Sequence, residues 1–172
     1  MNLTIRQENP SDYHAVYLVH QSAFGQDAES RLVEKLRNGK AFIPDLSLVA
    51  RIDQKVVGHI LFSKIKIIDG EKMHDSITLA PVAVLPEFQR MGIGSQLIRT
   101  GLVKARELGY RSVLVLGHKE YYPRFGFVPA SKWEIKSPYE VPDEAFMAME
   151  LVPGGLDKIH GMVQYDEAFG RV

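Results

Sequence analysis

The sequence has no cysteine among its 172 residues, and it carries no excess of one charge. The missing cysteine excludes disulfides, a cysteine nucleophile and a thiolate metal site. It also suits a reducing compartment, so we expect the protein to be cytoplasmic. The charges balance at 21 basic and 21 acidic side chains, whereas nonspecific nucleic-acid binders are usually basic. We therefore expect no nucleic-acid partner.

Long hydrophobic runs and paired histidines are also missing. No run approaches the ~20 apolar residues that a membrane-spanning helix needs, and we expect no membrane partner. The opening residues 1–8 are too polar for a signal peptide. The six histidines contain no pair at the i, i+4 spacing of a helical metal site, so we expect no metal ion. Nothing resembles a linker or a repeat, which predicts a single domain over residues 1–172.

Hydrophobic periodicity predicts strands and helices in an α/β order. Strands are expected at 3–6, 46–52, 56–68, 73–84 and 112–116, with closing strands around 127 and at 146–152. Helices are expected at 14–24, 28–37, 92–108 and, as a short element, 119–125. In the first helix, Ala15, Leu18, Val19 and Phe24 are expected to face inward. Antiparallel strands followed by a strand–helix–strand crossover predict a mixed sheet, mostly antiparallel and flanked by helices.

The most informative stretch is Gln89-Arg90-Met91-Gly92-Ile93-Gly94, which lies between a strand pattern and a helical pattern. Its two glycines therefore fall where a loop gives way to the first turn of a helix. Unpaired backbone N–H groups and the positive end of the helix dipole can hold an anion there. Glycine has no Cβ to block a phosphate, and Arg90 adds a cationic donor suited to phosphate oxygens.

The same stretch is compatible with a purely structural role, whereas two familiar phosphate motifs fit it poorly. A tight turn that only starts a helix is the open alternative. A P-loop requires a Gly-Lys-Ser/Thr ending, which this stretch lacks. A dinucleotide fingerprint requires a third glycine at the position of Leu97. The pattern therefore favours a pyrophosphate-binding turn of a different type.

Pro81 lies inside the strand pattern that precedes the turn. Because proline cannot donate to the sheet ladder, it indicates a β-bulge or a local end to strand pairing. Either feature would free backbone N–H and C=O groups near Val82 and Val84. The alternative is that Pro81 only marks an edge of the sheet.

Three elements, in order, resemble the GNAT superfamily of acyl-CoA-dependent N-acetyltransferases. Gln89, Gly92 and Gly94 fill its motif A, Gln/Arg-x-x-Gly-x-Gly/Ala. Residues 82–88 resemble the strand and loop that lead into this motif, and residues 121–127 resemble its Tyr-x-x-x-Gly-Phe element. The run from Gly117 also resembles a bacterial subgroup of poorly defined substrate. The resemblance covers most of the chain.

The resemblance implies a GNAT-like α/β (α+β) fold with a splayed strand pair, and acetyl-CoA as co-substrate. The pyrophosphate would lie on Gln89, Arg90, Met91, Gly92, Ile93, Gly94 and Ser95, and the pantetheine arm would pair with Val82, Ala83 and Val84. One backbone N–H would polarise the thioester carbonyl and stabilise the oxyanion that forms. The amine would attack directly, without an acyl-enzyme.

Tyr122 is the candidate general acid, because it lies four residues before Gly126, where family members often protonate the departing thiolate. An ordinary tyrosine, with a pKa of about 10, is protonated at neutral pH, as a donor must be. The alternative is a packing role, for which Tyr121 is the better candidate. The sequence does not identify the general base. His118, His59 and Glu87 are candidates, and ordered water is the alternative.

The acceptor is expected to be a small-molecule amine or a peptide or protein amine. We expect it to meet residues 24–27 and the segment 133–146, whose carboxylates would attract an amine or simply be solvated surface. An exposed edge strand near the C-terminus would permit a homodimer. Three functions stay open: an active acetyltransferase, an acyl-CoA-binding sensor or regulatory module without turnover, and an unrelated α/β protein whose glycine turn binds another anion or nothing.

Overall fold

The computed structural model describes residues 2–170. Within this range the three α-helices are α1 (Tyr13–Phe24), α2 (Ala28–Arg37) and α3 (Ile93–Glu107). The nine strands found there are β1 (Leu3–Gln7), β2 (Phe42–Ile52), β3 (Lys55–Asp69), β4 (Lys72–Val84), β5 (Ser112–Leu116), β6 (Val128–Pro129), β7 (Ile135–Lys136), β8 (Phe146–Glu150) and β9 (Gly161–Gln164). Two short 3-10 helices bear on the site, η2 (Pro86–Phe88) and η3 (Tyr122–Phe125).

Strand pairing confirms the predicted fold class, a mixed and mostly antiparallel sheet. Hydrogen bonds join the strands in the order β1-β2-β3-β4-β5-β8-β6, and β9 pairs with β3 and β7. The β4–β5 and β7–β9 pairs are parallel, whereas β1–β2, β2–β3, β3–β9, β5–β8 and β6–β8 are antiparallel. A parallel pair needs a crossover, and α3 supplies it between β4 and β5.

The chain divides into two compact units. The first holds the described residues up to Ser63 together with Ala80–Lys104, and the second holds Lys64–Leu79 with the described residues from Ala105. Strands β3 and β4 each contribute residues to both units. The expectation of a single domain over 1–172 stays a prediction.

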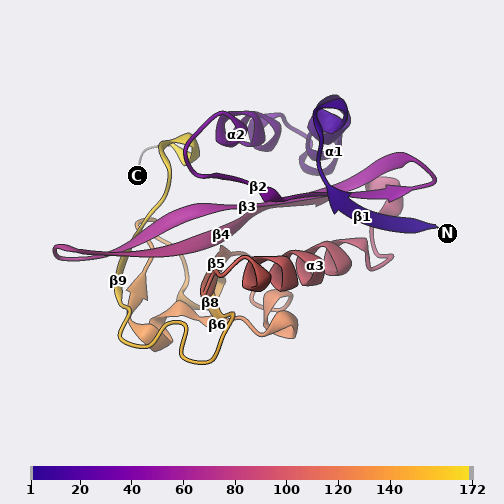
Figure 1. Ribbon diagram of the computed structural model, residues 1–172. Helices are drawn as coiled ribbons and strands as arrows, with labels where there is room; N and C mark the ends of the chain where they lie inside the picture. The colour runs from indigo at the N-terminus through magenta and orange to yellow at the C-terminus, as the bar shows by residue number, and fades with distance from the viewer. Residues whose placement is uncertain (1, 171–172) are drawn as a thin grey trace. The chain divides into compact units, whose positions relative to one another are not determined.

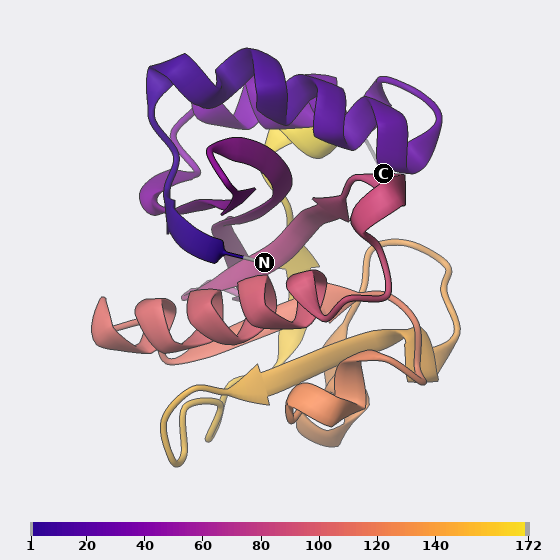
Figure 2. The same cartoon turned by 90° about the vertical axis from the view of Figure 1, so that its right-hand side faces the viewer.

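In the first unit, helices cover both faces of the strands. Figure 1 shows α1 and α2 on one face of β1, β2 and β3 and α3 on the other, and Figure 2 keeps that separation after a 90° turn. Asp53 and Gln54 connect β2 to β3 with φ of 48° and 76°, as a two-residue hairpin turn with a left-handed backbone requires. The face of the strands toward α1 and α2 and the face toward α3 are therefore distinct environments.

Two glycines let α3 approach β3 closely. A Cβ on Gly101 would lie 2.2 Å from Cε1 of Phe62, and a Cβ on Gly58 would lie 3.1 Å from Cδ1 of Leu97. Ile93, at the start of the helix, is 2% exposed and adds to the same packing. Because interiors are close-packed, these contacts fix where α3 begins relative to β3.

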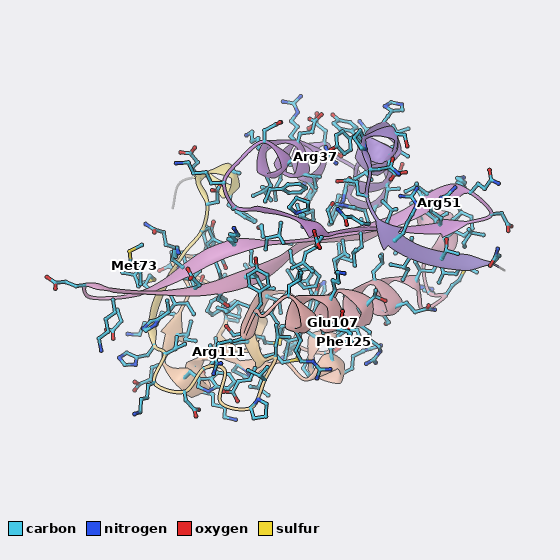
Figure 3. All side chains as sticks on the ribbon, viewed as in Figure 1. Arg37, Arg51, Met73, Glu107, Arg111 and Phe125 are labelled. Atoms are coloured by element: carbon cyan, nitrogen blue, oxygen red, sulfur yellow. The ribbon has the colours of Figure 1, made fainter. Side chains whose placement is uncertain are left out.

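The second unit has its own core on β5 and β8. Strand β4 pairs with β5 at Ile77–Val113 and Thr78–Leu114, and β8 pairs with β5 along its whole length. One cluster of buried apolar residues in this unit consists of Ile65, Ile67, Leu114, Ala130, Ile135, Phe146, Ala148, Leu156 and Val163. Figure 3 shows side chains in this unit, with Arg111 and Phe125 labelled.

The inward face of α1 differs from the prediction. Val19 is buried as expected, but Leu18 and Phe24 are 43% and 42% exposed, so the prediction for these two residues was wrong. The buried face consists of Val16, Val19 and His20, which follow the i, i+3, i+4 spacing of one helix face. A histidine therefore occupies a core position that hydrophobic periodicity could not identify.

Candidate active site

The turn between β4 and α3 lies in the first unit. It begins at the end of β4, where a backbone hydrogen bond connects the chain to β3. The N–H of Leu85 donates to the Val57 carbonyl at 2.8 Å. Within η2, the N–H of Phe88 donates to the Leu85 carbonyl at 2.9 Å. The side chain of Gln89 then reaches back, and its Nε2 donates to the Val84 carbonyl at 3.0 Å. Backbone and side-chain bonds thus tie the turn to β4.

Two residues of the turn have left-handed backbone conformations. Arg90 has φ of 65° and Gly92 has φ of 81°. For a residue with a Cβ this conformation costs roughly 1–2 kcal/mol, so the surrounding hydrogen bonds must hold the turn. A Cβ on Gly92 would meet no atom within 4 Å. The backbone angle, rather than crowding, favours glycine there, and the space in front of that backbone is open.

The first turn of α3 presents backbone donors. The N–H of Gln96 donates to the Gly92 carbonyl at 3.1 Å, which is the first bond of the helical ladder. The N–H groups of Ile93 and Gly94 precede that bond and have no acceptor within the helix. With the positive end of the helix dipole, they form a suitable site for a phosphate group.

The ten predicted cofactor-binding residues lie together at the end of β4, in the turn and in the first turn of α3. Gln89, Arg90, Met91 and Gly92 are exposed, Val82, Gly94 and Ser95 are half-buried, and Ala83, Val84 and Ile93 are buried. The exposed members include the cation, which is therefore accessible to a ligand.

Pro81 lies within β4, three residues beyond Thr78. The pairing of β4 with β5 runs over Ile77 and Thr78 only, so it ends before Pro81. This position agrees with the predicted local end to pairing. A bulge at Pro81 stays a prediction.

Tyr122 lies in the second unit, at the start of η3, and it is largely buried. Its ring lies against Gly117, where a Cβ would be 2.2 Å from Cε2 of the tyrosine. Phe127 and Tyr121 meet the ring edge-on, with ring centroids 5.8 and 5.2 Å away. Burial, with a smaller contribution from Tyr121, raises the pKa of Tyr122 to about 12. The phenol therefore keeps its proton at neutral pH, as a general acid must.

The three candidate bases have different environments. His118 and Glu87 are exposed. The His118 carbonyl accepts hydrogen bonds from the N–H groups of Tyr121 and Tyr122 at 3.1 and 3.3 Å, so this residue starts the turn that leads into η3. His59 is fully buried in the first unit and is hydrogen-bonded through both ring nitrogens. A catalytic role for any of the three stays a prediction.

A pocket of about 860 Å³ lies in the second unit. It is lined in part by Tyr139, Asp143 and Phe146, from the segment expected to meet the acceptor. His160, which precedes β9, and Met162, within β9, also line it, and sequence reasoning did not identify them because both are far in sequence from the segment 133–146. The pocket combines apolar walls with the carboxylates of Glu134 and Asp143 and the ammonium group of Lys136. Two carboxylates against one lysine leave an acidic excess, which suits a cationic group carried on an apolar body.

Neither a metal-binding cluster nor a membrane-spanning helix occurs among the described residues. Residues 2–170 contain no group of three or more His, Cys, Asp or Glu side chains placed to hold a metal ion. None of the helices in that range is both long enough and apolar enough to cross a membrane.

Comparison with known proteins identifies relatives across most of the chain. Residues 12–127 match the model of the acetyltransferase (GNAT) family. The chain is 42% identical over 147 residues to the uncharacterized N-acetyltransferase YjhQ of Escherichia coli (strain K12), an alignment that covers 83% of this chain and 80% of that protein. It is 33% identical over 170 residues to the uncharacterized N-acetyltransferase YhbS of the same strain, covering 98% of this chain and 99% of YhbS.

Solved structures agree with these sequence matches. The crystal structure of YhbS from Escherichia coli in complex with CoA has a TM-score of 0.92 at 30% identity, and the match covers 99% of this chain and 93% of that one. A GNAT family acetyltransferase from Brucella melitensis, in complex with acetyl-CoA, has a TM-score of 0.80 at 35% identity and covers 98% of each chain. The prediction made from three short sequence elements is confirmed: this chain belongs to the acetyltransferase (GNAT) family and is an N-acetyltransferase.

Proposed function

We propose that the protein transfers an acetyl group from acetyl-CoA to a primary amine by direct attack in a ternary complex. The observation that carries this proposal is the turn before α3, with Gly92 at φ 81° facing open space and backbone N–H groups directly after it. The two similar structures solved with CoA and acetyl-CoA support the choice of co-substrate.

The pyrophosphate of acetyl-CoA would lie on the amides from Gln89 to Ser95, with Arg90 as the accessible cation. The pantetheine arm would pair with the backbone of Val82, Ala83 and Val84, beyond the point at which β4 leaves β5. A backbone N–H of this segment would donate to the thioester carbonyl. Most of the rate acceleration would come from holding the two substrates together and from stabilising the oxyanion with a fixed donor.

The transfer itself exchanges one bond for another. The amine nitrogen forms a bond to the carbonyl carbon and gives up one proton to a base or to water, and the electron pair of the carbonyl moves to its oxygen. When the carbonyl reforms, the carbon–sulfur bond breaks and the sulfur leaves with its electron pair as a thiolate. Tyr122 would donate its proton to that thiolate, a role that its raised pKa of about 12 permits at neutral pH.

The acceptor would be a small-molecule amine or a peptide or protein amine that carries an apolar group. The pocket in the second unit supports this class, because Ile135, Phe146 and Met162 offer apolar contacts and Asp143 offers a counter-charge. We extend the proposal to a cytoplasmic location, a single domain over 1–172 and a homodimer formed through an edge strand.

A screen for thiol release tests the transfer directly. Purified protein is mixed with acetyl-CoA and a panel of amines, and free CoA is detected with a thiol reagent. The protein contributes no background, because it has no cysteine. Acetylated product above the blank with at least one amine supports the enzyme. Tight binding of acetyl-CoA with no product from small amines, peptides or protein lysines would favour the sensor alternative.

A further inference from the structure

A chain of hydrogen-bonded polar side chains crosses the interior of the first unit. His20 Nε2 lies 2.8 Å from His59 Nδ1, and His59 Nε2 lies 2.9 Å from Ser47 Oγ. The Ser47 hydroxyl donates to Glu8 Oε1 at 2.8 Å. Arg37, which Figure 3 labels at α2, donates to the same carboxylate through Nε at 3.2 Å and through a terminal nitrogen at 2.7 Å. Both histidines are 0% exposed, so the chain is shielded from water.

The carboxylate determines the direction of every hydrogen bond in this chain. A carboxylate can only accept, so the one Ser47 proton points to Glu8. Ser47 must then accept from His59, which places the His59 proton on Nε2. A neutral His59 therefore accepts at Nδ1, and His20 must donate from its own Nε2. The neutral His20 is left with an unprotonated Nδ1.

His20 Nδ1 has no hydrogen-bond partner among the residues that the structure describes, although it is fully buried. Buried polar atoms are nearly always paired with a hydrogen-bond partner. If these side chains served only to hold α1 against the sheet, we would expect Nδ1 of His20 to be paired as well. Phe24 stacks on the His20 ring with the two planes 9° apart and the centroids 6.1 Å apart. Phe24 is itself 42% exposed, so the side chain that stacks on the His20 ring extends to the surface.

The hydrogen-bonded side chains also lie beside β4, the strand that is proposed to bind the arm carrying the thioester. The bond from Leu85 N–H to the Val57 carbonyl joins the residue that follows β4 to β3. A Cβ on Gly58, the residue before His59, would lie 3.2 Å from the Ala83 carbonyl oxygen. Ala83 belongs to the segment proposed to pair with pantetheine. The polar chain and the proposed thioester segment are thus neighbours in the same unit.

We infer that Glu8, Ser47, His59 and His20 form the proton relay of the acetyl transfer, with His20 Nδ1 as the atom that accepts the proton of the attacking amine. This inference rests on the proposed function. The proton reaches Nδ1 directly or through one water, and the Nε2 proton of His20 moves to His59 Nδ1. The Nε2 proton of His59 moves to Ser47 Oγ, and the Ser47 proton moves to Glu8 Oε1. After the products leave, the same steps in reverse bring the proton back to His20 Nδ1, from which it passes to water and leaves both imidazoles neutral, and a proton from water restores the Tyr122 hydroxyl.

Arg37 acts through Glu8 and is a positioning residue, whereas Ser47 passes the proton between His59 and Glu8. Arg37 holds the Glu8 carboxylate in place and also lies over the Tyr13 ring, 3.8 Å from its centroid. Burial of the two imidazoles lowers the pKa of His20 to about 4 and that of His59 well below its ordinary value. Both are therefore neutral at physiological pH, which is the state a relay that accepts a proton requires.

The first test needs no activity. In the intact protein labelled with ¹⁵N at histidine, NMR distinguishes imidazoles protonated at Nε2 from those protonated at Nδ1. The relay predicts that His20 and His59 are both neutral and both protonated at Nε2. A His20 protonated at Nδ1 would overturn the inference, whatever the enzyme assay gives.

The second test uses Ser47→Ala, which cuts the chain and leaves both imidazoles, with His14→Gln as a control at an exposed histidine of α1. We expect the kcat of Ser47→Ala to fall at least about 100-fold while its affinity for acetyl-CoA stays within twofold of wild type. His14→Gln should match the wild type. Wild-type turnover in folded Ser47→Ala would overturn the relay alone, whereas a wild type that binds acetyl-CoA but transfers nothing would contradict the proposed function as well.

A chemical rescue separates proton transfer from packing. In His20→Ala, added imidazole should raise the residual kcat at least about tenfold, because it supplies an accepting nitrogen. Pyrrole has the same ring size but no accepting nitrogen, and it should restore nothing. Equal restoration by both compounds would mean that His20 only fills space, and it would overturn the role assigned to Nδ1.

Discussion

Gln89 and Val84 are joined by a hydrogen bond from the side-chain amide of the glutamine to the backbone carbonyl of the valine, at 3.0 Å. The bond connects the turn proposed to hold the pyrophosphate with the strand segment proposed to hold the pantetheine arm. The same glutamine begins the sequence motif. Its structural task is therefore to set the position of the turn on the strand, in addition to any contact that its backbone makes with a phosphate.

Replacement of this glutamine should weaken cofactor binding without unfolding the protein. In Gln89→Ala the turn loses its side-chain bond to β4, and a net hydrogen bond contributes about 1 kcal/mol. We expect the Kd for acetyl-CoA, measured by calorimetry, to rise by roughly fivefold. Gln21→Ala, at an exposed glutamine of α1, is the matched control. An unchanged Kd in Gln89→Ala would show that the turn holds its position without this bond.

Removal of the Tyr122 hydroxyl should slow the chemical step. In Tyr122→Phe we expect kcat to fall by on the order of 100-fold, because the thiolate loses its proton donor, while the Kd for acetyl-CoA is unchanged. Tyr121→Phe should behave as wild type. Because the pKa of Tyr122 is raised to about 12, the wild-type rate should show no alkaline decline from this group up to about pH 11. Full activity of Tyr122→Phe in the thiol-release assay would exclude the tyrosine as the acid.

Gly117 should be required for the placement of Tyr122. A methyl group at this position would lie 2.2 Å from Cε2 of the tyrosine, so the ring or the backbone must move. We expect Gly117→Ala to lower the free energy of unfolding by about 1–3 kcal/mol in urea denaturation, and to lower kcat. Gly39→Ala is the control, since a Cβ there meets its nearest atom at 3.4 Å. A Gly117→Ala variant as stable and as active as Gly39→Ala would mean that the ring adjusts without consequence.

Mild acid should destabilise the protein through its buried histidines. His20 has a pKa lowered to about 4 by burial and by the charge of Arg37, so between pH 6.5 and 4 the unfolded chain binds its proton and the folded chain does not. The free energy of unfolding should therefore rise with pH across this window and level off above about 6.5. His20 should contribute about 3 kcal/mol to this rise. His59, whose pKa is also lowered and which faces His20, Arg37 and Glu8, adds to the same slope.

Denaturation of wild type and His20→Gln from pH 4 to 8 checks this pH dependence. The variant should show a shallower slope between pH 4 and 6.5. Arg6 lowers the pKa of Asp12, so that carboxylate loses its stabilising effect only as the pH falls below about 4, outside the histidine window. Equal slopes in the two proteins would show that His20 does not control acid stability.

Much of the fold could be predicted where local signals are strong. Residues 28–37 and 112–116 were predicted with the bounds that the structure has, because Asn38 and Gly39 end the helix and a short apolar run marks the buried strand. The short strands β6, β7 and β9 were not separated, since each has two to four residues and finds its partner far away in sequence. Their identity depends on tertiary pairing that no local pattern encodes.

The candidate site also has parts that the sequence predicted and parts that it did not. The glycine turn and Tyr122 were proposed from contiguous motifs, and their roles stay predictions. The hydrogen-bonded side chains that link Glu8 to His20 were not predicted as a group. His20 and His59 are 39 positions apart in sequence, as are Glu8 and Ser47, and only folding brings them together. The one available signal was a histidine on the apolar face of a helix, and periodicity alone assigned that face to Leu18 and Phe24 instead.

The binding of acetyl-CoA at the turn before α3 is the central claim, and calorimetry tests it most directly. Wild type, Gly92→Glu and Gly70→Glu are titrated with acetyl-CoA. Gly70 matches Gly92 in having a positive φ and no atom within 4 Å of an added Cβ, so the control carries the same strain and charge. We expect saturable binding by wild type and Gly70→Glu, and none by folded Gly92→Glu. Equal binding by all three, or no binding by folded wild type, would contradict the claim.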